Sequence, residues 1–251
     1  MPVMQTPVLY VFAISHYCEK ARWALEYLGI EYTLKFLPVG VHTSVAKKFG
    51  LPQSALPFLQ LDERIIQGSS NIIDWAEQHR ADASQSLSAT SDLEASRKLE
   101  ARLDDLLGVH IRRYFYSEAL VEFPRTVLPV FTRDLPLWQR LITTAGWGVI
   151  RKIMITRMDL GYEQGMESRA LIVNELDWLD ETLADGRQFL CGEALSRVDI
   201  TAASLIAPLV QPAKHPTYTA MEIPPRARVD CQAWRTRPSL QWVTQLYEHY
   251  R

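Results

Sequence analysis

The sequence is poor in cysteine and has no long hydrophobic run. Its 251 residues include three cysteines, Cys18, Cys191 and Cys231, whose odd number and wide spacing predict no disulfide framework. Scattered free cysteines are typical of a reducing compartment. The N-terminal residues lack the basic segment of a signal peptide, and no run approaches the ~20 apolar residues that span a bilayer. We therefore expect a cytoplasmic protein without a membrane partner.

The chain also has little net charge. It carries 27 basic and 29 acidic residues, which give a formal net charge of −2, and its pI is near 6.3. This balance predicts no broad basic surface, so nucleic acid and anionic membranes are not expected as partners. With 47% hydrophobic residues, the chain is long enough for one large domain or two small ones, each with its own core.

The first eighty residues alternate between strand and helix patterns. A β-branched apolar run comes first, and a helical spacing of apolar residues then ends at Gly29. The later elements are a strand, a short helix, a hairpin and a helix opened by two serines. These segments are residues 8–14, 18–28, 32–36, 44–49, 58–67 and 69–76. The order βαβαββα predicts a thioredoxin-like domain over residues 1–80.

Strand patterns disappear in the second part of the chain. Residues 81–92 are small and polar, which predicts a linker. Residues 93–251 are predicted to form an all-helical domain, so the fold class is α/β plus all-α. The predicted helices are residues 93–122, 138–158 and 168–183 and an apolar helix that Ser196 and Asp199 cap.

The tetrapeptide Ser15-His16-Tyr17-Cys18 stands between the first strand and the first helix. Thioredoxin-like redox proteins keep their Cys-x-x-Cys motif at this place, but here the first cysteine is replaced by Ser15. A hydroxyl at this position suits the stabilisation of a thiolate that belongs to another molecule, although a serine before a helix also serves as a simple cap. Cys18 is predicted to pack inward as a small apolar residue, and a redox role is the alternative.

Four segments resemble the cytosolic glutathione S-transferase superfamily, in particular its serine-type classes such as zeta, tau and theta. The first is the helix signature that begins at Ser15. The others are a proline-containing loop, a serine-containing helix start and a capped helix in the helical domain. These three segments are Leu51-Pro52-Gln53-Ser54-Ala55-Leu56-Pro57, Ser69-Ser70-Asn71-Ile72-Ile73 and Ser196-Arg197-Val198-Asp199. The resemblance spans both predicted domains, and residues 124–165 are the part that it does not place.

The resemblance implies specific roles for the residues. Ser15 would donate a hydrogen bond to the thiolate of glutathione, the co-substrate, with no metal involved. Leu56 and Pro57, joined by a cis peptide bond, would present backbone groups to the cysteinyl part of glutathione, whereas a trans bond would make them a plain turn. Ser69 and Ser70 would hold the γ-glutamyl carboxylate, although such residues also open helices without any ligand.

Tyr114, on the long helix, would line the pocket of a small hydrophobic electrophile. Two positions depart from the family pattern, because Ala55 replaces a lysine and Ser69 replaces an acidic or amide residue. The missing contacts would then come from Lys47, Lys48 or a partner subunit, since the resemblance also implies a homodimer. In that dimer the partner's Asp104 and Asp105 would face the glutamyl amine, or would form only a solvated helix surface.

Three functions follow from these patterns. The leading hypothesis is a glutathione transferase that conjugates glutathione to a small electrophile. The second is a glutathione-dependent thiol–disulfide oxidoreductase that uses Cys18. The third is a non-catalytic interaction module, which the altered glutathione contacts keep open.

Overall fold

The computed structural model describes residues 6–88, 92–218 and 222–251. The chain divides into two compact units, one of residues 1–86 and 129–150 and the other of residues 87–128 and 151–251. The first segment of this unit ends at residue 86, inside the linker predicted over residues 81–92. Residues 89–91 of that linker lie outside the described part. The first unit also includes residues 129–150, which the sequence pattern assigned to the helical domain.

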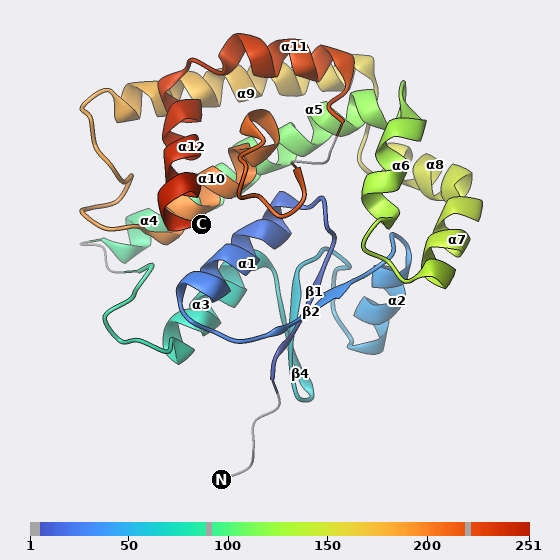
Figure 1. Ribbon diagram of the computed structural model, residues 1–251, viewed down its shortest axis with the longest axis horizontal. Coiled ribbons are helices and arrows are strands. Elements are labelled where there is room, and N and C mark those ends of the chain that lie inside the picture. Colours follow the sequence, from blue (N-terminus) through green and yellow to red (C-terminus); the bar gives the residue numbers. More distant parts are fainter. Residues whose placement is uncertain (1–5, 89–91, 219–221) are drawn as a thin grey trace. The chain divides into compact units, whose positions relative to one another are not determined.

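The N-terminal part of the first unit has the predicted order of strands and helices (Figure 1). Its elements are β1 (Val8–Val11), α1 (His16–Tyr27), β2 (Thr33–Phe36), α2 (Val41–Lys48), β3 (Phe58–Leu61), β4 (Arg64–Gln67) and α3 (Ser69–His79). The strands form one sheet in the order β2-β1-β3-β4. β1 pairs parallel with β2, and the pairs β1–β3 and β3–β4 are antiparallel. The predicted thioredoxin-like fold is confirmed.

The core of this sheet domain consists of the apolar residues of β1, β3, α1 and α3. Leu9, Trp23, Phe58 and Ile72 are almost fully buried. Helices α1 and α3 pack against each other, and α3 also contacts β3 and β4. The buried faces therefore fix the beginnings of α1 and α3, which carry the predicted site residues, on one rigid support.

Three further helices lie partly or wholly in the first unit. They are α6 (Pro124–Thr132), α7 (Leu137–Ala145) and α8 (Trp147–Arg157). The prediction of a single helix over residues 138–158 is wrong, because the helix is interrupted at Gly146 and forms two helices, α7 and α8. Glycine disfavours a helix interior, and the N–H of Gly146 closes α7 on the carbonyl of Ile142 at 2.9 Å. Trp147 is then buried against Phe131, with ring centroids 5.6 Å apart.

The second unit is helical in its described part. Its elements are α4 (Leu93–Leu103), η1 (Asp104–Gly108), α5 (Val109–Ala119), α9 (Tyr162–Leu183), α10 (Arg197–Val210), α11 (Pro225–Trp234) and α12 (Pro238–Tyr250). The long helix predicted over residues 93–122 is present, with a π-helical turn, η1, between α4 and α5. In the described residues of the whole chain, no helix is both long enough and apolar enough to cross a membrane.

Helix α10 is the buried centre of this unit. Ser196 and Asp199 form the predicted capping box, in which the Ser196 hydroxyl also donates to Asp199 Oδ2 at 2.6 Å. Arg197 donates from Nε to Glu100 Oε2 on α4 at 2.6 Å, and both side chains are buried. The capping box pairs the polar groups at the start of a helix that has almost no contact with water, and the ion pair compensates the buried charge of Arg197.

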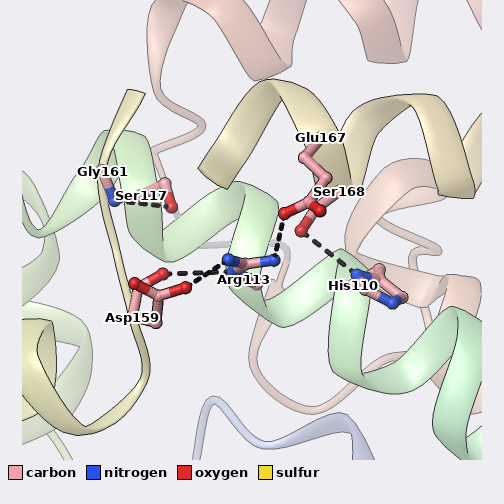
Figure 2. A network of polar contacts seen from close by, with 7 residues as sticks. All are labelled: His110, Arg113, Ser117, Asp159, Gly161, Glu167 and Ser168. Carbon is pink, nitrogen blue, oxygen red and sulfur yellow. Dashed lines mark hydrogen bonds and ion pairs between the residues drawn. The ribbon is translucent and has the colours of Figure 1, made fainter. Parts of the chain in front are cut away.

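Helices α5 and α9 pack closely and are tied by polar contacts (Figure 2). Arg113 on α5 donates to Asp159 and Glu167, and Ser117 accepts from the N–H of Gly161 at 3.3 Å. Figure 2 also shows His110 beside Ser168, with 3.2 Å between Nδ1 and Oγ. These contacts fasten the turn before α9 to the middle of α5.

Candidate functional site

Ser15 lies at the N-cap of α1, directly after the turn that follows β1. Its N–H donates to the carbonyl of Phe12 at 3.2 Å, which fixes the turn. Its side-chain oxygen accepts from the N–H of Cys18 at 3.3 Å, and its side chain is only partly buried. A hydroxyl that accepts in this way still has its own proton, which it can donate to the Cys18 sulfur or to a ligand. The structure thus gives Ser15 the cap geometry, and the cap leaves its donor function intact.

Cys18 occupies the position of the second cysteine of a redox motif. Its side chain is 1% exposed, and burial raises the pKa of the thiol to about 11, although a hydrogen bond with Ser15 partly opposes this effect. At neutral pH the group is a protonated thiol inside the core. Because the thiolate is the reactive form, this environment disfavours a redox role for Cys18.

The Leu56–Pro57 segment precedes β3, and its peptide bond is cis. Both residues are buried. The Gln67 side chain, at the end of β4, donates to the carbonyls of Gln53 and Ala55 at 2.9 and 3.0 Å. The carbonyl of Pro57 accepts from the N–H of Gly68 at 3.0 Å, so this loop is attached to the residue immediately before α3.

Ser69 and Ser70 form the first turn of α3. The chain enters the helix through Gly68 at φ 90°, a left-handed conformation that glycine adopts without strain. Backbone N–H groups in a first helical turn have no intrahelical acceptor, and they attract anions. The Ser69 side chain is buried, whereas Ser70 is partly exposed. Ser70 is therefore the better placed of the two hydroxyls to meet a ligand.

Lys20 is a site residue that the sequence pattern did not indicate. It lies on α1, its side chain is 0% exposed, and its Nζ donates to Ser70 Oγ at 3.1 Å. This bond occupies an acceptor position of the Ser70 hydroxyl and so fixes its oxygen beside α1. Lysines are rarely buried so completely, and a spacing pattern alone cannot distinguish a buried lysine from an exposed one.

The structure therefore places the predicted glutathione-binding residues in the sheet domain, at the starts of α1 and α3 and in the loop before β3. Ser15 and Ser70 each stand at the positive end of a helix dipole. The pair α1–α3 and the Lys20–Ser70 bond connect these two helix beginnings, and the Pro57–Gly68 bond connects the loop to α3. This arrangement can hold an extended anionic ligand and stabilise a negative charge near Ser15.

Tyr114 is placed differently from the expectation. It lies on α5 in the second unit, is 0% exposed, and donates from its hydroxyl to Asp230 Oδ2 at 2.5 Å. Arg169 also donates two bonds to the Asp230 carboxylate. Burial, with the hydrogen bond to Asp230, raises the Tyr114 pKa strongly. The side chain ties α5 to α11, and this placement argues against a lining role in an electrophile pocket.

The residues considered for the missing glutathione contacts are accessible. Lys47 and Lys48 are exposed in the last turn of α2, and Ala55 is exposed in the loop. Asp105 is exposed and Asp104 half-buried in η1 of the second unit. Over the described residues, no group of three or more His, Cys, Asp or Glu side chains is arranged to hold a metal ion.

A cavity of about 430 Å³ lies in the second unit. Its lining residues come from the end of α10, from α11 and α12 and from the segment before α11, and they include Arg228, Cys231 and Arg235. Burial raises the pKa of Cys231 to about 12, so its thiol is protonated and unreactive at neutral pH. None of the predicted site residues lines this cavity.

The comparison of the sequence with protein-family models gives a match within the sheet domain. Residues 9–84 match the family model described as "Glutathione S-transferase, N-terminal domain". No curated protein sequence matches the chain.

Solved structures match over nearly the whole chain. Glutathione transferase GSTFuA3 from Phanerochaete chrysosporium is 14% identical with a TM-score of 0.64, and the match covers 99% of this chain and 98% of that one. A glutathione S-transferase of Ceriporiopsis subvermispora in complex with glutathione is 15% identical with a TM-score of 0.64 and 98% of both chains covered. The β-etherase LigF from Sphingobium sp. strain SYK-6 is 16% identical with a TM-score of 0.60, covering 96% of this chain and 99% of that one. At these identities the likeness concerns the fold.

Proposed function

We propose, on the premise that the chain belongs to the glutathione S-transferase superfamily through residues 9–84, that it is a glutathione transferase. In this proposal the protein binds glutathione in the sheet domain, stabilises its thiolate, and lets the thiolate attack a small electrophile. The observation that carries the proposal is the position of Ser15, a partly exposed hydroxyl at the N-terminus of α1 in the matched domain.

Ser15 would lower the pKa of the glutathione thiol. A free thiol has a pKa near 8.5 and is mostly protonated at neutral pH. Donation from the Ser15 hydroxyl and the positive end of the α1 dipole both favour the thiolate over the thiol. Lowering the pKa by about two units requires about 2.7 kcal/mol, which one hydrogen bond to an anion and a helix terminus can supply together.

The start of α3 would hold the γ-glutamyl carboxylate. The first-turn N–H groups and the Ser70 hydroxyl provide donors, and Lys20 orients that hydroxyl by donating to its oxygen. Lys20 is therefore a positioning residue in this proposal, because it acts through Ser70. The backbone of Leu56 would pair with the cysteinyl part of glutathione in the manner of a strand.

The test is binding to immobilised glutathione, followed by conjugation with a panel of electrophiles. The panel should include an ether, because one structural neighbour is a β-etherase. Retention on the resin and elution by free glutathione are the expected results. A protein that passes through the resin unretained would instead be a non-catalytic module, and the proposal would then fail at its first step.

A further inference from the structure

The helices between Pro136 and Asp159 expose an unusual amount of apolar surface. Leu137, Trp138, Leu141 and Ile142 on α7 are between 62% and 72% exposed. Positions 137 and 141 lie one helical turn apart, as do 138 and 142, so the four side chains share one side of the helix. Val149, early in α8, is 67% exposed. We define these five residues, all in the first unit, as the α7–α8 apolar surface.

Such a cluster needs an explanation, whereas single exposed apolar residues do not. The opposite side of α7 is used for packing, since Thr143 is 3% exposed and Leu135, just before the helix, is also buried. The helix is thus amphipathic with its larger apolar side chains facing outward. A helix that only completed the protein core would direct those side chains inward.

The same part of the sequence is strongly basic. Residues 124–158 contain six basic residues and one acidic residue, Asp134, although the whole chain has a net charge of −2. The six are Arg125, Arg133, Arg140, Arg151, Lys152 and Arg157. The expectation that the protein has no membrane partner relied on the whole-chain charge, which conceals this local excess.

Several of these cations are available for a partner. Arg125, Arg140, Lys152 and Arg157 are exposed, and the described part of the chain provides none of them with a carboxylate or another polar partner for its side chain. Arg140 lies within α7, next to Leu141. On α8, Ile153 follows Val149 by one turn, with Lys152 beside it and Arg157 one turn further on. Within the first unit, Arg140 borders the apolar side chains of α7; Lys152 and Arg157, in the second unit, follow Val149 along the same helix α8.

We propose that the α7–α8 apolar surface binds peripherally to an anionic lipid bilayer. Leucine, isoleucine and tryptophan side chains would enter the interface between headgroups and acyl chains, and the neighbouring cations would contact the lipid phosphates. Tryptophan favours this interface because its ring is apolar and its N–H is polar. A second copy of the chain fits less well, because two such surfaces would bring like charges together.

The experiment is sedimentation of the full-length protein with vesicles. One set contains phosphatidylcholine alone, and the other contains phosphatidylcholine with about one-third phosphatidylglycerol. The wild type is expected to bind the anionic vesicles at least about tenfold better than the neutral ones, and added salt should weaken this binding. Equal partition into both vesicle types, or no binding to either, would overturn the proposal.

Matched variants separate the surface from general effects. Leu141→Glu and Val229→Glu each put a carboxylate at an exposed apolar residue, 63% and 65% exposed, and Val229 lies on α11 in the second unit. Arg140→Glu and Arg235→Glu make the same comparison for two exposed arginines. Leu141→Glu and Arg140→Glu should each weaken binding to anionic vesicles about tenfold. The controls Val229→Glu and Arg235→Glu should each weaken it less than about twofold.

Thermal unfolding and light scattering complete the design. All four positions are exposed, so each variant should unfold near the wild-type temperature. If Leu141→Glu binds vesicles as well as the wild type does, the surface is not the membrane contact. If Leu141→Glu instead lowers the mass of an oligomer, the surface is an interface between copies, and the lipid proposal is wrong.

Discussion

Lys20 offers the sharpest test of how the start of α3 recognises glutathione. The perturbation is Lys20→Met, which removes the donor to Ser70 Oγ at 3.1 Å and nearly preserves the length of the side chain. Lys20 is fully buried and has a further interaction besides the bond to Ser70, so methionine also removes that interaction. The free energy of unfolding is therefore measured beside glutathione binding, and binding is compared at a temperature where the variant is folded.

The magnitude follows from the role of the bond. Without Lys20 the Ser70 hydroxyl can turn its proton to other acceptors, and its bond to the γ-glutamyl carboxylate is weakened. A net loss of about 1 to 1.5 kcal/mol is expected, which raises the Kd for glutathione about five- to tenfold. Ser70→Ala should have a similar effect. Because both changes remove the same bond, the double variant should bind about as weakly as either single one.

Calorimetric titration with two ligands is the assay. Glutathione contacts the whole site, whereas the dipeptide cysteinylglycine lacks the γ-glutamyl group. The variants should therefore bind cysteinylglycine with an affinity within about twofold of that of the wild type. Lys98→Met, at an exposed lysine on α4, is the control for loss of a positive charge. Additive losses in the double variant, or equal weakening of both ligands, would refute the positioning role of Lys20.

Three further outcomes are expected. With a pKa near 11, only about one thousandth of the Cys18 thiol should be ionised at pH 8. Cys18 should therefore resist a thiol reagent in the native protein and react after unfolding in urea. Rapid labelling of the native protein, located at Cys18 by peptide mapping, would contradict this expectation. Gly165→Ala places a Cβ 2.9 Å from Ser117 Cβ on the facing helix and should cost about 1 to 3 kcal/mol in chemical denaturation. Ser117→Gly is itself destabilising, because it removes the acceptor for the Gly161 N–H, but Gly165→Ala should cost less in that background if the close approach is the cause. Finally, light scattering at micromolar concentration should give the mass of two chains of 28.8 kDa, and the mass of one chain would remove both the homodimer and the idea that Asp104 or Asp105 completes a partner's site.

The sequence predicted the parts of the fold that depend on local patterns. Apolar runs separated by turn residues were sufficient to find the four strands, and the Ser196–Asp199 spacing was sufficient to find the cap of α10. The break at Gly146 was missed, because the apolar pattern continues across it. Whether a glycine interrupts a helix depends on tertiary contacts, here the burial of Trp147 against Phe131.

The candidate site was predicted only in outline. Ser15, Pro57 and Ser70 stand in segments with distinctive residues, so their places at a helix start or before a strand followed from the sequence. Lys20 was missed because its burial depends on how α1 meets α3. The resemblance implies a pocket role for Tyr114 through its place on the long helix, whereas in the structure its hydroxyl donates to Asp230, 116 positions further along the chain.

The central claim is that Ser15 stabilises the thiolate of bound glutathione. The measurement is the ultraviolet absorbance of the thiolate against pH, taken for the wild type, Ser15→Ala and free glutathione. We expect the wild type to lower the pKa of the bound thiol by about two units. Ser15→Ala should reverse most of this shift, while its affinity for glutathione stays within a few-fold of the wild type. A bound thiol whose pKa is the same in the wild type and in Ser15→Ala would contradict this claim.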